Sequence, residues 1–216
     1  MNLEQLRFNM IEQQIRPWDV LDPKVLDLLK LVRREQFVPA ASKALAFMDI
    51  DVPLGHGVSM WQPKIEARAL QALDLQATDS VLEVGTGSGH LTALLARLAG
   101  QVTSVEIVPE LSALATRNLL THHIGNVTLQ VGDAANRWGE AEYDAIVLTG
   151  SVPMIPEAFK NQLKVGGRLF AIVGDAPAMQ AQLITRVAAD RFVTKVLFET
   201  AVAPLQNAAQ PQRFVF

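Results

Sequence analysis

The residues best suited to chemistry are three glycines that follow an apolar run, together with one acid further along the chain. Glycines stand at positions 85, 87 and 89 after the apolar run 81–84, and Glu106 ends the next apolar run. Glycine adopts positive φ angles and lets a ligand approach the backbone without a Cβ in the way, while a following helix offers unpaired N–H groups. A carboxylate such as Glu106 accepts hydrogen bonds from both hydroxyls of a ribose. The pattern predicts a site for a nucleoside cofactor.

A glycine motif alone also fits a tight turn between a strand and a helix, with no ligand bound. Here the motif lies between an apolar run and a helical pattern, and Glu106 follows Gly85 by twenty-one residues, which favours the ligand. The dinucleotide pattern G-x-G-x-x-G requires its third glycine five residues after the first. Gly89 comes four residues after Gly85, so the spacing favours another nucleoside cofactor over a dinucleotide. An oxidoreductase with a nicotinamide cofactor remains the weaker alternative.

Two further apolar runs end in residues that fit the same site. The run 126–131 is followed by Asp133 and Ala134, and the run 143–149 ends at Thr149. The carboxyl ends of parallel strands meet in one crevice, where ligands of open α/β sheets bind. Asp133 is expected to accept a hydrogen bond from an adenine amino group, although a loop carboxylate without a ligand is the plainer alternative.

These residues must be positioned by strands and helices that alternate along the chain. The expected strands are 80–85, 101–106, 126–131, 143–149 and 167–173, and the expected helices lie near 62–73, 88–99, 109–121 and 156–163. Two more strands are expected at 182–187 and 192–198, with 214–216 as a candidate final edge. The alternation indicates an α/β fold with a doubly wound, mostly parallel sheet that ends in an antiparallel hairpin.

The composition indicates one globular domain without a polyanionic partner. The chain has 216 residues, of which 50% are hydrophobic, and this length and apolar content fit a single core. We expect one domain over 1–216, with an N-terminal helical and loop addition at 1–60 and a cofactor-binding core at 62–216. The 19 basic and 22 acidic residues give a net charge of -3 without blocks of like charge, which argues against nucleic acid and membrane partners.

The absence of particular residue types narrows the chemistry further. The chain has no cysteine, which excludes disulfides, thiolate metal sites and a cysteine nucleophile. Its four histidines are not at zinc-motif spacing, so no metal is expected. The first residues lack the basic start and apolar segment of a signal peptide, and no apolar run approaches the length of a membrane span. A cytoplasmic location is therefore expected.

The glycine loop and the strand ends together resemble the class I S-adenosylmethionine-dependent methyltransferases. The similarity covers residues 62 to about 175 and rests on Glu83, Gly85, Thr86, Gly87, Ser88, Gly89, Glu106, Asp133 and Thr149. It implies S-adenosyl-L-methionine as the cofactor and a seven-stranded Rossmann-like sheet. By this resemblance the loop from Gly85 to Gly89 lines the methionine and ribose, and Glu106 holds the ribose. Ile107 then flanks the adenine, and Asp133 with Ala134 meets its amino edge.

Segments outside the cofactor core are similar to the protein-L-isoaspartate O-methyltransferases. They are Met10–Ile15, Arg34–Pro39, Pro53–Gly57, Gln62–Pro63, Val81–His90, Leu163–Leu169 and Arg213–Val215, in the family's order along nearly the whole chain. The resemblance implies methylation of the carboxylate of L-isoaspartyl residues in damaged proteins or peptides. That carboxylate is already ionised at neutral pH, so positioning and exclusion of water are expected to supply most of the rate. We expect a monomer or a weak oligomer.

One loop departs from the family pattern. The family has glycine, a variable residue, Thr-Ile-Ser, a variable residue and proline, whereas residues 57–63 are Gly-Val-Ser-Met-Trp-Gln-Pro. Ser59 therefore replaces the threonine, and Trp61 replaces the serine whose hydroxyl lies beside the acceptor carboxylate and the methyl donor. Ser59 becomes the candidate catalytic hydroxyl. Trp61 either faces the substrate or packs beneath a lid, which is the more frequent use of a buried tryptophan.

Two more loop residues are candidates for substrate contact. His56 either contacts an anionic substrate or is a solvated loop histidine. Gln62 either bonds to the substrate backbone or starts a helix before Pro63. Because of Trp61, two alternatives to isoaspartyl methylation stay open. One is a methyltransferase of the same family with a different acceptor, and the other is a non-catalytic S-adenosylmethionine-binding protein.

Overall fold

A seven-stranded sheet organises the protein, and the computed structural model describes residues 2–211. The strand order is β5-β4-β3-β6-β7-β8-β9. The bounds are β3 Ser80–Val84, β4 Gln101–Glu106, β5 Val127–Val131, β6 Tyr143–Leu148, β7 Leu163–Val173, β8 Met179–Ala188 and β9 Arg191–Thr200. The strands from β5 to β7 pair in parallel, and β8 and β9 continue the sheet antiparallel. The α/β class, with its mostly parallel sheet and antiparallel C-terminal hairpin, is confirmed.

Alternation along the strands supplies an apolar surface to each face of the sheet. Helices α3 (Pro63–Leu73), α4 (His90–Leu98) and α5 (Pro109–Thr121) contribute to one buried cluster, which contains Val81 of β3. The neighbouring Leu82 belongs to the second cluster, with Phe159 of the short helix α6 (Glu157–Asn161). Successive strand side chains point to opposite faces, so β3 is buried on both sides, as expected of a central parallel strand.

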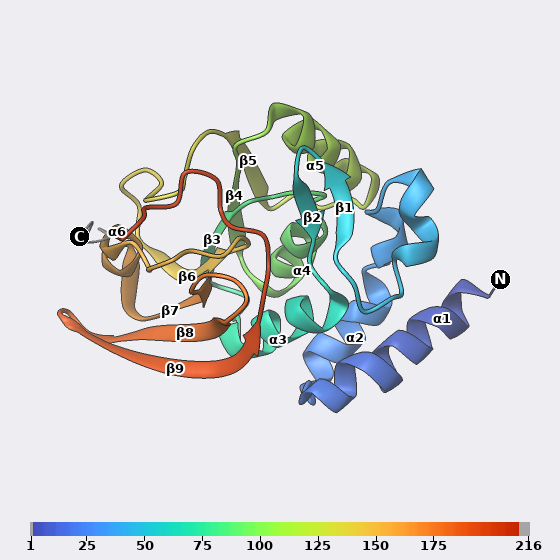
Figure 1. Ribbon diagram of the computed structural model, residues 1–216, viewed down its shortest axis with the longest axis horizontal. Helices are drawn as coiled ribbons and strands as arrows, with labels where there is room; N and C mark the ends of the chain where they lie inside the picture. The colour runs from blue at the N-terminus through green and yellow to red at the C-terminus, as the bar shows by residue number, and fades with distance from the viewer. Residues whose placement is uncertain (1, 212–216) are drawn as a thin grey trace.

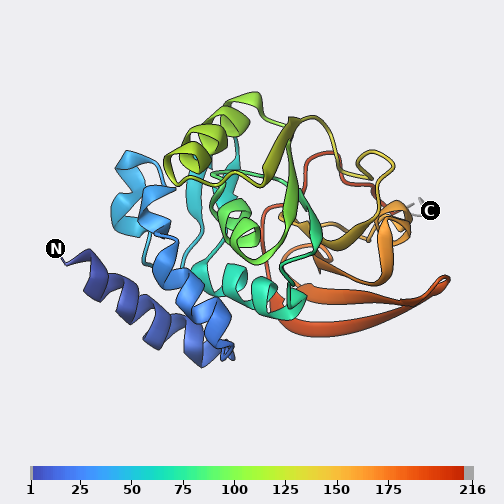
Figure 2. The same ribbon diagram turned by 180° about the vertical axis from the view of Figure 1, so that it is seen from behind.

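An N-terminal layer covers one end of the molecule. It consists of α1 (Leu3–Met10), a π-helical turn (Ile11–Ile15), 3-10 turns at Arg16–Trp18, Arg34–Gln36 and Ala40–Leu45, α2 (Pro23–Leu31), and a hairpin of β1 (Val52–Gly55) and β2 (Val58–Met60). Figures 1 and 2 show this layer at the end of the molecule opposite the tip of the β8–β9 hairpin. Among the described residues, no helix is both long and apolar enough to cross a membrane.

The helix starts follow the local sequence signals. Proline occupies the first helical position of α2, α3 and α5, where its missing N–H costs nothing and its fixed φ is already helical. Before α2, the Asp22 carboxylate accepts a hydrogen bond from the backbone N–H of Lys24 at 2.8 Å. The expected start of α5 agrees with this signal, and the expected bounds of both α5 and β4 match the structure to the residue.

The structure differs most from the expectation in two segments, and a third expectation lies outside the described residues. The region 1–60 contains the β1–β2 hairpin, which the helical patterns did not indicate because its strands have only four and three residues. Strand β7 begins at Leu163 rather than at 167, because Leu163 already pairs with Tyr143 of β6 before a register shift. The candidate edge at 214–216 and the resemblance at 213–215 lie outside the described residues.

Candidate active site

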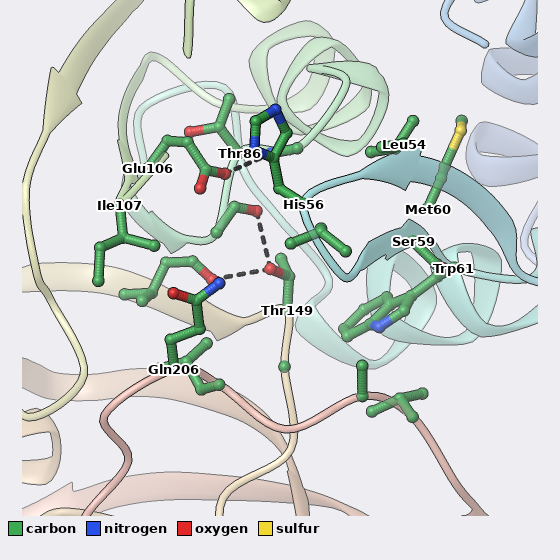
Figure 3. A pocket seen from close by; sticks show the side chains of 18 of the residues that line it. Leu54, His56, Ser59, Met60, Trp61, Thr86, Glu106, Ile107, Thr149 and Gln206 are labelled. Atoms are coloured by element: carbon green, nitrogen blue, oxygen red, sulfur yellow. Dashed lines mark hydrogen bonds between the residues drawn. The ribbon is translucent and has the colours of Figure 1, made fainter. Parts of the chain in front are cut away.

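A cavity of about 370 Å³ lies at the carboxyl ends of β3, β4 and β6. Its size falls within the range of small-molecule sites. Figure 3 shows Glu106 and Ile107 on one side of this pocket and Ser59 and Trp61 on the other, with Thr149 between them. The crevice expected at the strand ends is therefore present, and it continues to the β1–β2 hairpin.

The glycine loop is shaped by close contact as well as by its φ angles. Gly85 has φ +96°, and a Cβ there would lie 2.1 Å from Thr149 Oγ1. The Thr149 hydroxyl is held against the loop because it lies 2.8 Å from the carbonyl oxygen of Val84 and 2.7 Å from that of Gly85. Gly87, at φ +55°, also lines the pocket, together with Thr86 and Ser88. Bare backbone is thus exposed to a ligand where a side chain would block it.

Gly89 lies at the end of the glycine loop, against α5. It does not line the pocket, and a Cβ on it would lie 3.1 Å from the Cβ of Ala115 on α5. Its φ of +80° ends the loop directly before α4. This glycine therefore permits close packing of the loop against α5, and its contact with the cofactor stays a prediction.

Glu106 is held in place by the backbone around it. Its carboxylate accepts hydrogen bonds from the N–H of Gly87 at 2.8 Å and from the N–H of Val108 at 3.0 Å. The residue is 3% exposed and lines the pocket beside Ile107. Each carboxylate oxygen has two lone pairs, so the fixed group can still accept from ligand hydroxyls. The structure thus brings Glu106 to the glycine loop, as the ribose interpretation requires.

Glu83 is buried and does not line the pocket, so its predicted cofactor contact stays a prediction. It is fully buried, and one of its oxygens accepts from Thr92 at 2.5 Å and from Ser104 at 2.6 Å. The Ser104 hydroxyl also lies 2.6 Å from the hydroxyl of Thr86, a pocket residue. Burial raises the pKa of Glu83 to about 8. Glu83 supports the loop through Ser104, and the carboxyl carries a proton at neutral pH.

Asp133 lines the far end of the pocket together with Ala134. Its Oδ1 accepts from the backbone N–H of Ala135 at 2.9 Å, and its Oδ2 accepts from the side-chain amide of Asn207 at 2.8 Å. The Asn207 bond connects the C-terminal segment to the site. Sequence reasoning offered no role for this segment.

The C-terminal segment forms part of the pocket wall. Val202, Ala203, Pro204, Leu205 and Gln206 line it. The segment is fixed to the end of β6 because the N–H of Ser151 donates to Ala203 at 3.0 Å and the N–H of Leu205 donates back to Ser151 at 2.8 Å. An extended segment held by so few backbone bonds has no hydrophobic period, so no sequence signal identifies it.

The β1–β2 hairpin supplies the other wall. Its turn contains His56 at φ +54°, between Gly55 and Gly57, and this exposed histidine lines the pocket with Ser59 and Trp61. Gln62 does not line the pocket. It directly precedes α3, which begins at Pro63, so the helix-start alternative describes its position.

Trp61 both lines the pocket and packs in the interior, and whether it faces the substrate stays a prediction. It lines the pocket, yet only 6% of it is exposed. Its ring packs against Phe170 of β7 at 6.1 Å between centroids and 62° between planes. The indole is therefore a buried wall of the pocket, and changing it alters both the acceptor end and the packing on the sheet.

A buried charge network behind Trp61 was not found by sequence reasoning. The Arg34 guanidinium donates to the carbonyl oxygens of Ala46 and Trp61 and to the Glu66 carboxylate, whose Oε2 also lies 2.9 Å from Nδ1 of His90. Burial raises the pKa of Glu66, but Arg34 and His90 outweigh it, and the pKa is lowered. Arg34 and His90 are 32 and 24 residues away from Glu66 in the sequence, and no local spacing signals such a pairing.

The pocket is acidic. Its titratable lining residues are Asp51, His56, Glu66, Glu106 and Asp133, and neither lysine nor arginine lines it among the described residues. A positively charged ligand group is therefore favoured over an anionic one, except where a carboxyl group is neutralised.

Comparisons with known proteins give one consistent match. The model of the family Protein-L-isoaspartate(D-aspartate) O-methyltransferase (PCMT) matches residues 5–210. Protein-L-isoaspartate O-methyltransferase 1 of Rhodopseudomonas palustris (strain HaA2) is 39% identical over 201 residues, which cover 92% of this chain and 82% of the relative. Protein-L-isoaspartate O-methyltransferase 2 of Marinobacter nauticus is 37% identical over 206 residues, which cover 94% of each.

Two solved structures share the fold. A beta-aspartate methyltransferase (PCMT) from Plasmodium falciparum in complex with S-adenosyl-L-homocysteine has a TM-score of 0.79 at 21% identity, and the match covers 95% of this chain and 99% of that one. A second structure, named protein-L-isoaspartate O-methyltransferase, has a TM-score of 0.79 at 24% identity and covers 94% of this chain and 65% of that one. The expected Rossmann-like methyltransferase fold is confirmed.

The contact of Gly85 with Thr149 predicts a large cost for Gly85→Ala. Gly166→Ala is the matched control, because Gly166 has a similar φ of +86° and open space around it. The control should lose about 1 kcal/mol of unfolding free energy through backbone strain. Gly85→Ala should lose about 1–3 kcal/mol more through the clash. Adding Thr149→Ala should recover part of that excess, and urea unfolding that finds the two glycine variants equal would contradict the prediction.

The buried Glu83 carboxyl predicts that stability falls as pH rises from its ordinary pKa of 4.5 to about 8. In this window the folded protein keeps a proton that the unfolded chain releases, so the free energy of unfolding drops by up to about 1.4 kcal/mol per pH unit. Glu83→Gln cannot titrate and should lack this decrease. Denaturant unfolding across the window measures both proteins, and an equally steep fall in the variant would refute the assignment.

Proposed function

The chain belongs to the protein-L-isoaspartate(D-aspartate) O-methyltransferase family, and from this we propose that it transfers a methyl group from S-adenosyl-L-methionine to isoaspartyl carboxylates in proteins or peptides. Curated relatives with 37–39% identity over more than nine tenths of the chain carry that name. The observation that carries the proposal is the single pocket that joins the glycine loop and Glu106 to the β1–β2 hairpin. The methyl donor and the acceptor can both bind in this pocket.

The donor end of the pocket fits the proposed cofactor. Gly85, Thr86, Gly87 and Ser88 would face its amino acid and ribose, with Glu106 accepting from the ribose hydroxyls. Ile107, Asp133, Ala134 and Thr149 would surround the rest of the nucleoside. Two features support this fit: the Gly85 cradle, which a Cβ would fill, and the acidic lining, which suits a positively charged sulfonium.

The reaction requires the protein to position the two reactants and to exclude water from them. S-adenosyl-L-methionine supplies a methyl group on a sulfonium, so transfer to a carboxylate oxygen yields the ester and S-adenosyl-L-homocysteine without removal of a proton. Trp61 and the segment from Val202 to Leu205 bring apolar surface to the pocket wall, and with an acceptor bound this surface would keep water from the acceptor end. Fixing the reactants in line can supply a large part of the rate. Ser59, the one hydroxyl in residues 57–63, is the proposed catalytic hydroxyl that orients the acceptor.

A second candidate function keeps the methyltransferase and changes the acceptor. It is favoured by Trp61, which lines the pocket at the loop position where the family pattern has serine. An indole has one N–H donor and is far larger than a hydroxymethyl group, so it alters both the volume and the hydrogen bonding offered to an acceptor.

Methyl transfer from labelled S-adenosyl-L-methionine to an isoaspartyl peptide tests the proposal directly. We expect transfer to this peptide and none to the same peptide with a normal aspartyl residue, because the relatives are named for isoaspartyl substrates. Calorimetry with S-adenosyl-L-homocysteine on the same sample controls for an intact donor end. Binding of the cofactor product without any transfer would reject the isoaspartyl acceptor.

A pair of Trp61 variants separates the two candidate functions. Trp61→Phe keeps a ring against Phe170 and should retain most isoaspartyl activity. Trp61→Ser leaves a cavity that costs about 3–5 kcal/mol of unfolding free energy, and it should raise KM for the peptide. If only Trp61→Ser methylates the isoaspartyl peptide and the unaltered protein does not, the natural acceptor is a different molecule.

A further inference from the structure

Asp51 lines the acceptor end of the pocket. It belongs neither to the glycine motif nor to the segments that resemble the family. It directly precedes β1, and the next residue, Val52, pairs with Met60 of β2. Asp51 and Trp61 therefore extend the two strands of one hairpin at the same end. Asp51, Ser59 and Trp61 all line the pocket, so a carboxyl group stands beside the site where the loop departs from the family pattern.

The Asp51 carboxyl forms no ion pair among the described residues. Hydrogen bonds from Gln62 and the more distant Arg34 favour its charged form, but its Oδ1 is buried and has no hydrogen-bond partner. Lys64 is engaged by Asp49 at 2.6 Å, and Arg34 is engaged by Glu66 and two carbonyl oxygens. An unsatisfied buried carboxylate oxygen is costly, and protonation of the carboxyl would remove part of that cost.

The neighbouring charges act on Asp51 in both directions. Burial raises the pKa of Asp51 above its ordinary 3.8, the backbone and side chain of Gln62 and the Arg34 guanidinium lower it, and Asp49 raises it again, with a net increase. The pocket adds the Glu66 carboxylate and the His56 imidazole. A second carboxylate placed next to Asp51 would favour its protonated form further, because two like charges at close range share one proton.

We propose that Asp51 binds the methyl acceptor together with Ser59: its carboxyl group, in the protonated form, donates a second hydrogen bond to the isoaspartyl carboxylate. Residues 57–63 offer one hydroxyl fewer than the family pattern, because Trp61 replaces its serine. This inference rests on the proposed function. During transfer, a C–O bond forms at the free acceptor oxygen and the methyl–sulfur bond of the donor breaks. Asp51 keeps its proton throughout, so no base is required, and the protein provides a donor where its acidic pocket would otherwise repel the substrate.

The test compares Asp51→Asn, Asp51→Leu and the control Asp49→Asn with the unaltered protein. Asn is nearly the same size and donates permanently, Leu cannot donate, and Asp49 is a neighbouring carboxyl that does not line the pocket. KM and kcat for the isoaspartyl peptide are measured from mildly acidic to mildly alkaline pH. Peptide binding to the complex with S-adenosyl-L-homocysteine is measured by calorimetry in two buffers of different ionisation enthalpy, which reports proton uptake.

For the unaltered protein, KM should rise with pH by up to about tenfold per unit once the shared proton is lost, and binding should take up as much as about one proton. Asp51→Asn should show a low KM without that slope and no proton uptake. Asp51→Leu should have a KM about tenfold or more above that of Asp51→Asn at every pH, and above that of the unaltered protein at acidic pH, as expected for a lost hydrogen bond to a charged group. Asp49→Asn should keep the slope, displaced slightly to lower pH because one like charge is removed.

Several results would overturn the inference. The first is a slope that persists in Asp51→Asn, which would assign the titration to another group. The others are a pH-independent KM in the unaltered protein and an Asp51→Leu variant with unchanged KM at acidic pH. Failure of the proposed function gives a different result, because then none of the proteins methylates the isoaspartyl peptide at any pH although each binds S-adenosyl-L-homocysteine. The inference would fail with it in that case.

Discussion

The buried ion pair between Arg34 and Glu66 is the interaction on which the site depends most. The two side chains are 2% and 3% exposed, and His90 completes the network on the Glu66 carboxylate. Arg34 also holds the carbonyl oxygens of Ala46 and Trp61. Removing one partner of such a pair typically costs about 3–5 kcal/mol, because it leaves an uncompensated charge in the interior. The network therefore fixes the N-terminal layer, the end of the hairpin, α3 and the start of α4 as one unit.

This unit explains how two unlike halves of a pocket are held together. The donor half is built from backbone, with Gly85 and Gly87 at positive φ and Glu106 bonded to their loop. The acceptor half is built from the hairpin and the C-terminal segment, neither of which belongs to the sheet. His90 is the first residue of α4, immediately after the glycine loop. Its contact with Glu66 thus connects the loop to the carboxylate that also binds Arg34 beneath the acceptor half.

Three carboxyl groups near the pocket avoid a bare buried charge in different ways. Glu66 stays ionised because Arg34 and His90 compensate it, and its pKa is lowered. Glu83 has only the hydroxyls of Thr92 and Ser104, so burial prevails and the pKa rises to about 8. Asp51 is intermediate, with a raised pKa and an open pocket beside it. Charge compensation by cations, by a proton or by a bound ligand follows from which partners the fold brings within reach.

The sequence by itself determined the elements whose signals are local. The strand 101–106 and the helix 109–121 were predicted to the residue, because a continuous apolar run and a proline at the first helical position act over a few neighbours. The glycines and Glu106 likewise identified the donor half, since a strand, a tight loop and the next strand end have a fixed order in parallel sheets.

Only the tertiary structure decided the acceptor half. Pairing of Arg34 with Glu66 joins residues 32 apart, and His90 reaches Glu66 across 24 residues. Such contacts leave no period in the sequence, because nothing in the residues between them has to match. The side of a strand to which a residue points is decided in the same way. Glu83 has the residue type and spacing of a ligand contact, yet β3 turns it into the interior. Trp61 became both wall and core because Phe170 lies behind it.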